Sequence, residues 1–178
     1  MQPFNEQYSI LFKCLKTGLH NFDFELDDRF FEYFENSDCL GGTFRINAEL
    51  DKKDHLLSLC FSFSGSTMII CDRCLEELDI PLEFKSNLFV KFGPEEQETD
   101  ADVIYLEQNE HILYLADYFM ESIFLNLPIK RVHQKDAKGN DMCNKSMIEK
   151  LNEHRSVGDN AETDPRWDSL KNLISNQN

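Results

Sequence analysis

Two cysteines separated by two residues, Cys-Asp-Arg-Cys at residues 71–74, form the one arrangement in this sequence with a recognisable metal-binding spacing. A turn of this length lets both sulfurs bind one zinc ion at about 2.3 Å. A structural zinc site has four ligands, so Cys71 and Cys74 supply half of one. His133 and Cys143 are the candidates for the other half, although the residues between them are too many for a compact knuckle. A zinc site at these four residues is therefore one interpretation of the pair.

Two other interpretations of the cysteine pair stay open. The same spacing occurs in disulfide oxidoreductases, in which the first cysteine begins a helix after a buried strand and has a lowered pKa. Ser66–Ile70 would be that strand, but Leu75–Pro81 leaves too little room for the helix. The third interpretation is a pair of buried thiols, since free cysteine often packs as a small apolar residue. In each case we expect reduced cysteines, because no secretory signal accompanies them.

Charge is unevenly distributed along the 178 residues, whose formal net charge is −15. This charge excludes binding of phosphate backbones by the surface as a whole. Residues 76–126 hold 13 acidic and two basic residues, whereas residues 129–155 hold four acidic and seven basic residues. We therefore expect a small basic patch beside the cysteines, with an ordinary solvated face as the alternative. The candidate nucleic-acid contacts are Arg73, Lys130, Arg131 and Lys135.

Alternating apolar and polar residues dominate the first half of the sequence and predict strands. Long strands are expected over residues 43–53, 55–64 and 80–92, and shorter ones over 7–14, 18–27 and 103–107. A short helix is expected over 29–35, and a longer one over 115–127, where Pro128 ends it. The fold class that follows is α+β and β-rich. It is an antiparallel sheet or partly open barrel with a packed helix and a short C-terminal helix.

The chain is expected to divide into three parts. A single β-rich domain over residues 1–151 carries the cysteine pair, a polar linker covers 152–162, and a helical tail covers 163–178. The candidate partner-binding residues of the tail are Arg166, Trp167 and Leu170. A short helix is marginal unless something buries its apolar face, so the tail docks either on its own domain or on a partner.

The sequence predicts a cytoplasmic protein without catalytic activity. The first residues contain neither a basic nor an apolar signal region, and no apolar run approaches the roughly 20 residues that span a bilayer. No membrane contact is therefore expected. The sequence also contains no nucleophile elbow, phosphate-binding loop or metal-hydrolase helix motif, so we do not expect an enzyme. It leaves the oligomeric state open.

Several segments, in their order and spacing, resemble the YceD family of bacterial large ribosomal RNA subunit accumulation proteins. These segments are Cys71–Leu75 after an apolar strand, Phe89–Gly93, Leu125–Lys130 at the end of a helix, and Asp164–Leu170 near the C-terminus. The resemblance extends from about Phe44 to Leu173. It is greatest to members from Bacteroidetes-type bacteria.

The resemblance implies a non-enzymatic factor for accumulation of 23S ribosomal RNA and for assembly of the large ribosomal subunit. Its implied partners are basic ribosomal proteins, which the acidic segment would attract, and 23S rRNA, which the basic patch would contact. Some members carry a second compact cysteine pair where this sequence has only His133 and Cys143. That departure leaves zinc binding open, with packing, a three-ligand site or an intermolecular site as the other roles for Cys71 and Cys74. The alternatives to the assembly role are a thiol-disulfide oxidoreductase using Cys71 and Cys74, and a structural zinc-binding interaction protein.

Overall fold

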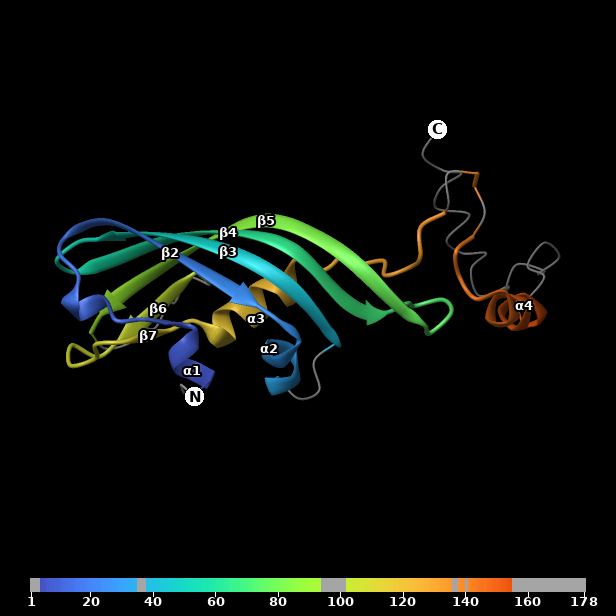
Figure 1. Ribbon diagram of the computed structural model, residues 1–178, viewed down its shortest axis with the longest axis horizontal. Coiled ribbons are helices and arrows are strands. Elements are labelled where there is room, and N and C mark those ends of the chain that lie inside the picture. Colours follow the sequence, from blue (N-terminus) through green and yellow to red (C-terminus); the bar gives the residue numbers. More distant parts are fainter. Residues whose placement is uncertain (1–3, 35–37, 94–101, 136–137, 140, 155–178) are drawn as a thin grey trace, which may run out of the picture.

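Five strands form one curved sheet in the order β2-β3-β4-β5-β6 in the computed structural model, which describes residues 4–34, 38–93, 102–135, 138–139 and 141–154 (Figure 1). All neighbouring strands are antiparallel except β5 and β6, which are parallel. The strands are β2 (Gly18–Leu26), β3 (Gly41–Lys52), β4 (Leu56–Ile70), β5 (Glu77–Phe92) and β6 (Val103–Leu106). The outer strands do not pair with each other, so the sheet is open rather than a closed barrel.

The concave face of the sheet holds the core, because the alternation in the strands places every second side chain there. In β3 the buried residues Phe44, Ile46, Ala48 and Leu50 alternate with exposed polar ones. Helix α3 (Ala116–Leu125) lies across this face (Figure 1). Its Phe119 ring is fully buried and packs edge-on against the rings of Phe24, Phe61 and Phe63. Burial of these rings contributes apolar stabilisation where α3 meets the sheet.

Two glycines let β3 and β4 approach closely near the end of the sheet that carries the cysteine pair. A Cβ atom at Gly65 would collide with the backbone of Thr43 and Phe44. Gly42 has φ of +145°, and a Cβ there would collide with the Ser66 carbonyl oxygen. Only glycine fits both positions. With the two backbones this close, β4 stays paired with β3 beyond Gly65. It therefore continues as one strand to Ile70, whereas the sequence predicts a strand that ends at Ser64.

The N-terminal segment differs from its prediction. Residues 7–14 were expected to form a strand, but only β1 (Ser9–Ile10) is extended, between α1 (Phe4–Gln7) and the 3-10 helix η1 (Phe12–Cys14). β1 pairs with β7 (Leu113–Tyr114), so this segment forms no part of the main sheet. The reason is packing: Phe4 stacks on Phe30 of α2 (Asp28–Tyr33) and Tyr8 packs edge-on against the same ring, contacts that the alternation pattern does not encode.

Helix α4 (Lys145–Glu153) lies at the end of the molecule beyond the β4–β5 hairpin (Figure 1). It runs two residues into the segment expected to be a linker. The predicted tail, with Arg166, Trp167 and Leu170, lies outside the described residues. The α+β, β-rich class with a helix packed on the sheet is confirmed. Within the described residues, no helix combines the length and apolar character that crossing a bilayer requires.

Candidate metal centre

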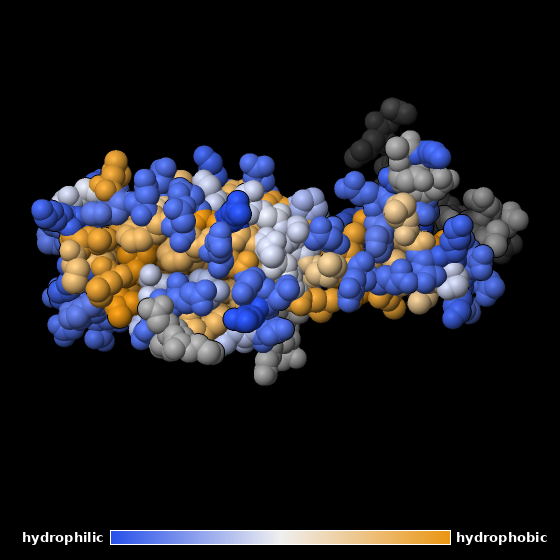
Figure 2. Space-filling model, viewed as in Figure 1, coloured by the Kyte–Doolittle hydropathy of each residue, from blue (hydrophilic) through white to orange (hydrophobic). Residues whose placement is uncertain are grey.

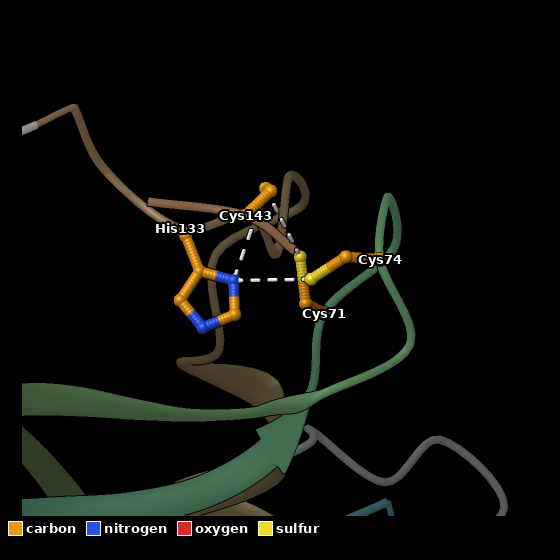
Figure 3. Close-up of side chains that lie close together, drawn as sticks. All are labelled: Cys71, Cys74, His133 and Cys143. Atoms are coloured by element: carbon orange, nitrogen blue, oxygen red, sulfur yellow. Dashed lines mark hydrogen bonds between the residues drawn. The ribbon is translucent and has the colours of Figure 1, made fainter. Parts of the chain in front are cut away.

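The cysteine pair lies in the tight loop that joins β4 to β5. The backbone N–H of Cys71 donates to the carbonyl of Glu76, and the N–H of Leu75 donates back to the carbonyl of Cys71 at 3.0 Å. Leu75, directly after the second cysteine, adopts a left-handed conformation with φ of 58°. This turn brings both cysteine sulfurs to the same side of the loop (Figure 3).

Two residues from the segment after α3 complete a four-ligand cluster with this pair. Cys71, Cys74, His133 and Cys143 place their ligand atoms within 4.8 Å of one another (Figure 3). The Sγ atoms of Cys71 and Cys143 are 4.0 Å apart, and Nδ1 of His133 is 3.4 Å from Sγ of Cys74 and 3.9 Å from Sγ of Cys143. A tetrahedral zinc ion bound by sulfur and nitrogen requires separations of about 3.5–3.8 Å. The cluster therefore has the ligand composition of a zinc site, and its ligand atoms lie close enough together that it could hold one metal ion.

The histidine of the cluster is oriented by a second contact. Nε2 of His133 lies 3.1 Å from the carbonyl oxygen of Glu77, the first residue of β5. A carbonyl can only accept, so Nε2 carries the proton and Nδ1 presents its lone pair to the sulfurs. An outer carbonyl that fixes the tautomer in this way is typical of metal-bound histidine. Glu77 was not singled out in the sequence, because its contribution is a backbone oxygen.

The three thiols of the cluster are buried, and the pKa values of Cys71 and Cys143 are shifted in opposite directions. Cys71, Cys74 and Cys143 are at most 4% exposed. Burial opposes ionisation of Cys71, but the backbone N–H groups of Cys74, Arg73 and His133 donate to its sulfur and lower its pKa to about 6. Burial, together with the neighbouring sulfurs of Cys71 and Cys74, raises the pKa of Cys143 to about 11. One thiolate is thus stabilised by the fold, while full ionisation of the cluster requires a cation.

The loop lacks the feature that dithiol oxidoreductases use. In those enzymes a helix begins at the first cysteine and its dipole stabilises the thiolate. Here Cys71 follows β4, and the chain turns directly into β5, so no helix begins at the pair. The lowered pKa of Cys71 comes instead from backbone N–H groups, and a third cysteine and a histidine stand beside the pair. This donor set suits metal binding.

Several hydrogen bonds and an ion pair connect residues 131–144 to the cysteine loop at residues 71–76. The backbones of Asp72 and Arg131 are joined by a hydrogen bond of 2.7 Å, and the Asp72 carboxylate accepts from the Arg131 N–H. Arg73 forms a two-pronged ion pair with Asp141, which holds the pKa of that carboxyl below its usual range. Asn144 caps α4 and donates to the Glu76 carboxylate. Residues from three parts of the chain therefore meet at this end.

The structure brings the four predicted nucleic-acid contacts to the same end but gives them different surroundings. Arg73 is paired with Asp141, and Arg131 forms an ion pair of 2.7 Å with Asp38. Lys130 and Lys135 are exposed, and neither belongs to an ion pair among the described residues. The two arginines thus act at least partly as structural anchors. Contact of any of the four with RNA stays a prediction.

Helix α4 and the acidic partners of the arginines were missed by the sequence analysis. The Asn-Lys-Ser-Met segment at residues 144–147 carries a helix-capping signal, since the Asn144 side chain accepts from the N–H groups of Ser146 and Met147. Met147, Ile148 and Leu151 then provide a short apolar face. These two signals together could have identified the helix. Nothing local to the sequence indicates that Asp141 pairs with Arg73.

A protein-family model matches most of the chain. The family model YceD, described as large ribosomal RNA subunit accumulation protein YceD, matches residues 59–174. The matched region starts within β4 and contains all four residues of the metal cluster. No curated protein and no solved structure matches the chain.

Proposed function

Because the chain belongs to the YceD family of large ribosomal RNA subunit accumulation proteins, we propose that it is a non-enzymatic factor for 23S rRNA accumulation and assembly of the large ribosomal subunit. The family name implies the role in accumulation of the large ribosomal RNA. The match over residues 59–174 is the observation that carries the proposal. The bound partner and the cytoplasmic location are part of the proposal.

Zinc binding at Cys71, Cys74, His133 and Cys143 has a structural role in this proposal. The four side chains lie close to one another, and the three cysteines are almost fully buried, so a substrate would have little access to their sulfur atoms. A bound zinc ion would cross-link the β4–β5 loop to the segment that follows α3. That segment carries Lys130 and Lys135, so the cross-link would hold the exposed lysines at a fixed place beside the sheet.

The acidic side chains of β5 favour basic ribosomal proteins as the principal partners. Glu77, Asp79 and Glu83 are exposed along one edge region of the sheet, and Asp117 and Glu121 are exposed on α3. A surface with this charge repels RNA and raises the rate of encounter with basic proteins. RNA contact, where it occurs, would be confined to the lysines near the metal cluster.

The role in assembly is tested by sucrose-gradient analysis of cells that lack the protein. We expect large-subunit precursors to accumulate and 23S rRNA to fall, and we expect the wild-type chain to restore both. Cys143→Ser should fail to restore them, whereas Cys60→Ser, a half-buried thiol on β4 outside the cluster, should restore them fully. Normal large subunits in cells without the protein would overturn the proposal.

The choice of partner is tested by purifying the protein from cells with and without nuclease treatment. We expect basic ribosomal proteins to remain bound after RNA digestion. Reversing the charge of Glu77, Asp79 and Glu83 to lysine should release them, whereas the same reversal at Glu6, Asp54 and Glu110, which are also exposed, should not. Loss of every partner after nuclease treatment would instead identify RNA as the bound component.

A further inference from the structure

A groove of about 820 Å³ lies between the start of β5 and the segment that follows α3, next to the metal cluster. Its wall on the β5 side is formed by the consecutive residues 78–82 near the start of that strand. The opposite wall comes from the segment between α3 and Cys143. The apolar lining residues are Leu78, Ile80, Leu82, Pro128, Val132 and Met142. His133 of the metal cluster also lines it, so the groove ends at the site already described.

Two apolar side chains at the groove are exposed, Met142 in its lining and Ile129 between the lining residues Pro128 and Lys130. Ile129 is fully exposed and Met142 is 60% exposed. In the space-filling view, apolar residues are visible on the body of the molecule and again where the body meets the end that carries α4 (Figure 2). Single exposed apolar residues are ordinary, but a continuous apolar groove with an exposed rim is typical of a docking surface.

Charge and backbone chemistry restrict what can occupy the groove. Lys130 and Lys135 line it and are exposed, and Asp79 is the one acid among the described lining residues. A basic segment of a ribosomal protein would therefore meet like charge there. Pro81 also lines the groove and has no N–H to donate, so this part of β5 is a poor edge for an added strand. An apolar helix face flanked by acids fits both restrictions.

The C-terminal segment of this chain has that character. Trp167, Leu170 and Leu173 recur at every third position, as on one face of a helix, and Glu162, Asp164 and Asp168 lie around them. Arg166 is the one basic residue in that stretch before Lys171. The segment thus complements both the apolar lining and the two lysines of the groove.

The segment can reach the groove. The start of α4 lies beside the start of β5, because Asn144 donates to the Glu76 carboxylate at 2.6 Å. A helix of nine residues, as in α4, is about 13 Å long. Residues 154–162 can span up to about 30 Å when extended. The chain after α4 is therefore long enough to return past the helix to β5.

We propose that residues 163–174 dock as a helix in this groove, with Trp167 and Leu170 against its apolar lining and the flanking acids beside Lys130 and Lys135. Docking covers apolar surface next to the metal cluster and occupies the two lysines that lack ion pairs among the described residues. The proposal does not depend on the role in ribosome assembly, since it concerns only how the chain covers its own groove.

Trp167 is the single tryptophan, so its fluorescence in the full-length protein reports docking directly. We expect blue-shifted emission and several-fold weaker quenching by acrylamide than for free tryptophan, independent of protein concentration. The double variant Lys130→Glu, Lys135→Glu should expose Trp167 to quencher without loss of the fold, which far-ultraviolet circular dichroism monitors. The matched control is Lys13→Glu, Lys16→Glu, two exposed lysines that are not among the groove residues, and it should leave Trp167 protected.

The other outcomes overturn the proposal. Full quenching of Trp167 in the wild-type chain would show that the segment does not dock in the groove and is available to bind a separate partner. Protection that disappears on dilution would identify a second copy of the chain as the acceptor. Protection that survives the charge reversal at Lys130 and Lys135, and also survives Leu82→Asp, would place the segment elsewhere on the molecule.

Discussion

The body of the sheet and the end that carries the cysteine loop are stabilised by different interactions. Beneath the sheet, Phe119 of α3 is fully buried among aromatic rings from β2 and β4. At the cysteine end, α4 has no buried residue, although its Met147 and Ile148 pack partly against the core, and the other connections are ion pairs, backbone hydrogen bonds and the four-residue cluster. From this difference we expect the body to fold through apolar burial and its end to depend on a zinc cross-link at the four-residue cluster.

The largest expected effect is on the body. Phe119→Ala should lower the free energy of unfolding by about 3–5 kcal/mol, because it leaves a cavity between α3 and the sheet. Urea denaturation followed by circular dichroism measures this. Phe124→Ala is the matched control on the same helix: Phe124 is 45% exposed, so the loss should stay below about 1 kcal/mol. Equal losses for the two variants would contradict the account of the core.

The next largest effect is local and concerns the metal. Removal of zinc by a chelator, or Cys143→Ser, should abolish hydrogen-exchange protection in residues 126–154 while β3 and β4 keep theirs. Cys60→Ser serves as the control, since its thiol lies outside the cluster. If the chelator left the exchange of residues 126–154 unchanged, the cross-link would have no structural role; if it unfolded the whole sheet, the two regions would not be independent.

The pH dependence of zinc binding gives a smaller and graded effect. With its pKa raised to about 11, Cys143 carries a proton at neutral pH in the metal-free chain, and zinc must displace it. The apparent affinity should therefore fall at least tenfold for each pH unit of acidification. The fall should steepen below about pH 6, where Cys71 also holds a proton. Competition titrations with a zinc indicator between pH 5 and 8 measure this, and a flat profile would exclude thiolate ligation.

The smallest effect concerns the strained residue of the cysteine loop. Leu75 has φ of 58° and is 65% exposed, so its side chain adds strain and little packing. Leu75→Gly should raise the free energy of unfolding of the zinc-loaded protein by up to about 1 kcal/mol. Leu75→Ala keeps the Cβ atom and should give no gain. Thermal denaturation of both variants separates relief of strain from loss of the leucine side chain.

Much of the fold could be predicted because its strands alternate strictly. Phe44 to Leu50 in β3 is an example, since each apolar residue there is buried and each polar one exposed. The prediction of a strand over residues 7–14 was wrong, because the aromatic contact of Tyr8 with Phe30 joins segments far apart in the sequence. Local patterns predict how a segment alternates and do not predict which distant surface it meets.

The four residues of the candidate site could be named from the sequence, but their arrangement in space could not be predicted from it. The spacing of Cys71 and Cys74 follows from the turn they occupy, so the pair was evident. The long gap between His133 and Cys143 concealed their convergence, which depends on backbone pairing between Asp72 and Arg131 and on the ion pair of Arg73 with Asp141. These contacts link residues 59 and 68 positions apart, and no local spacing encodes them.

The most direct test of the central claim is the metal content of the full-length protein purified under reducing conditions from medium that contains zinc. Elemental analysis should find close to one zinc per chain in the wild type and in Cys60→Ser, and far less in Cys71→Ser. A folded wild-type protein without stoichiometric zinc would contradict the claim that Cys71, Cys74, His133 and Cys143 form a metal centre that fastens the end of the molecule to its sheet.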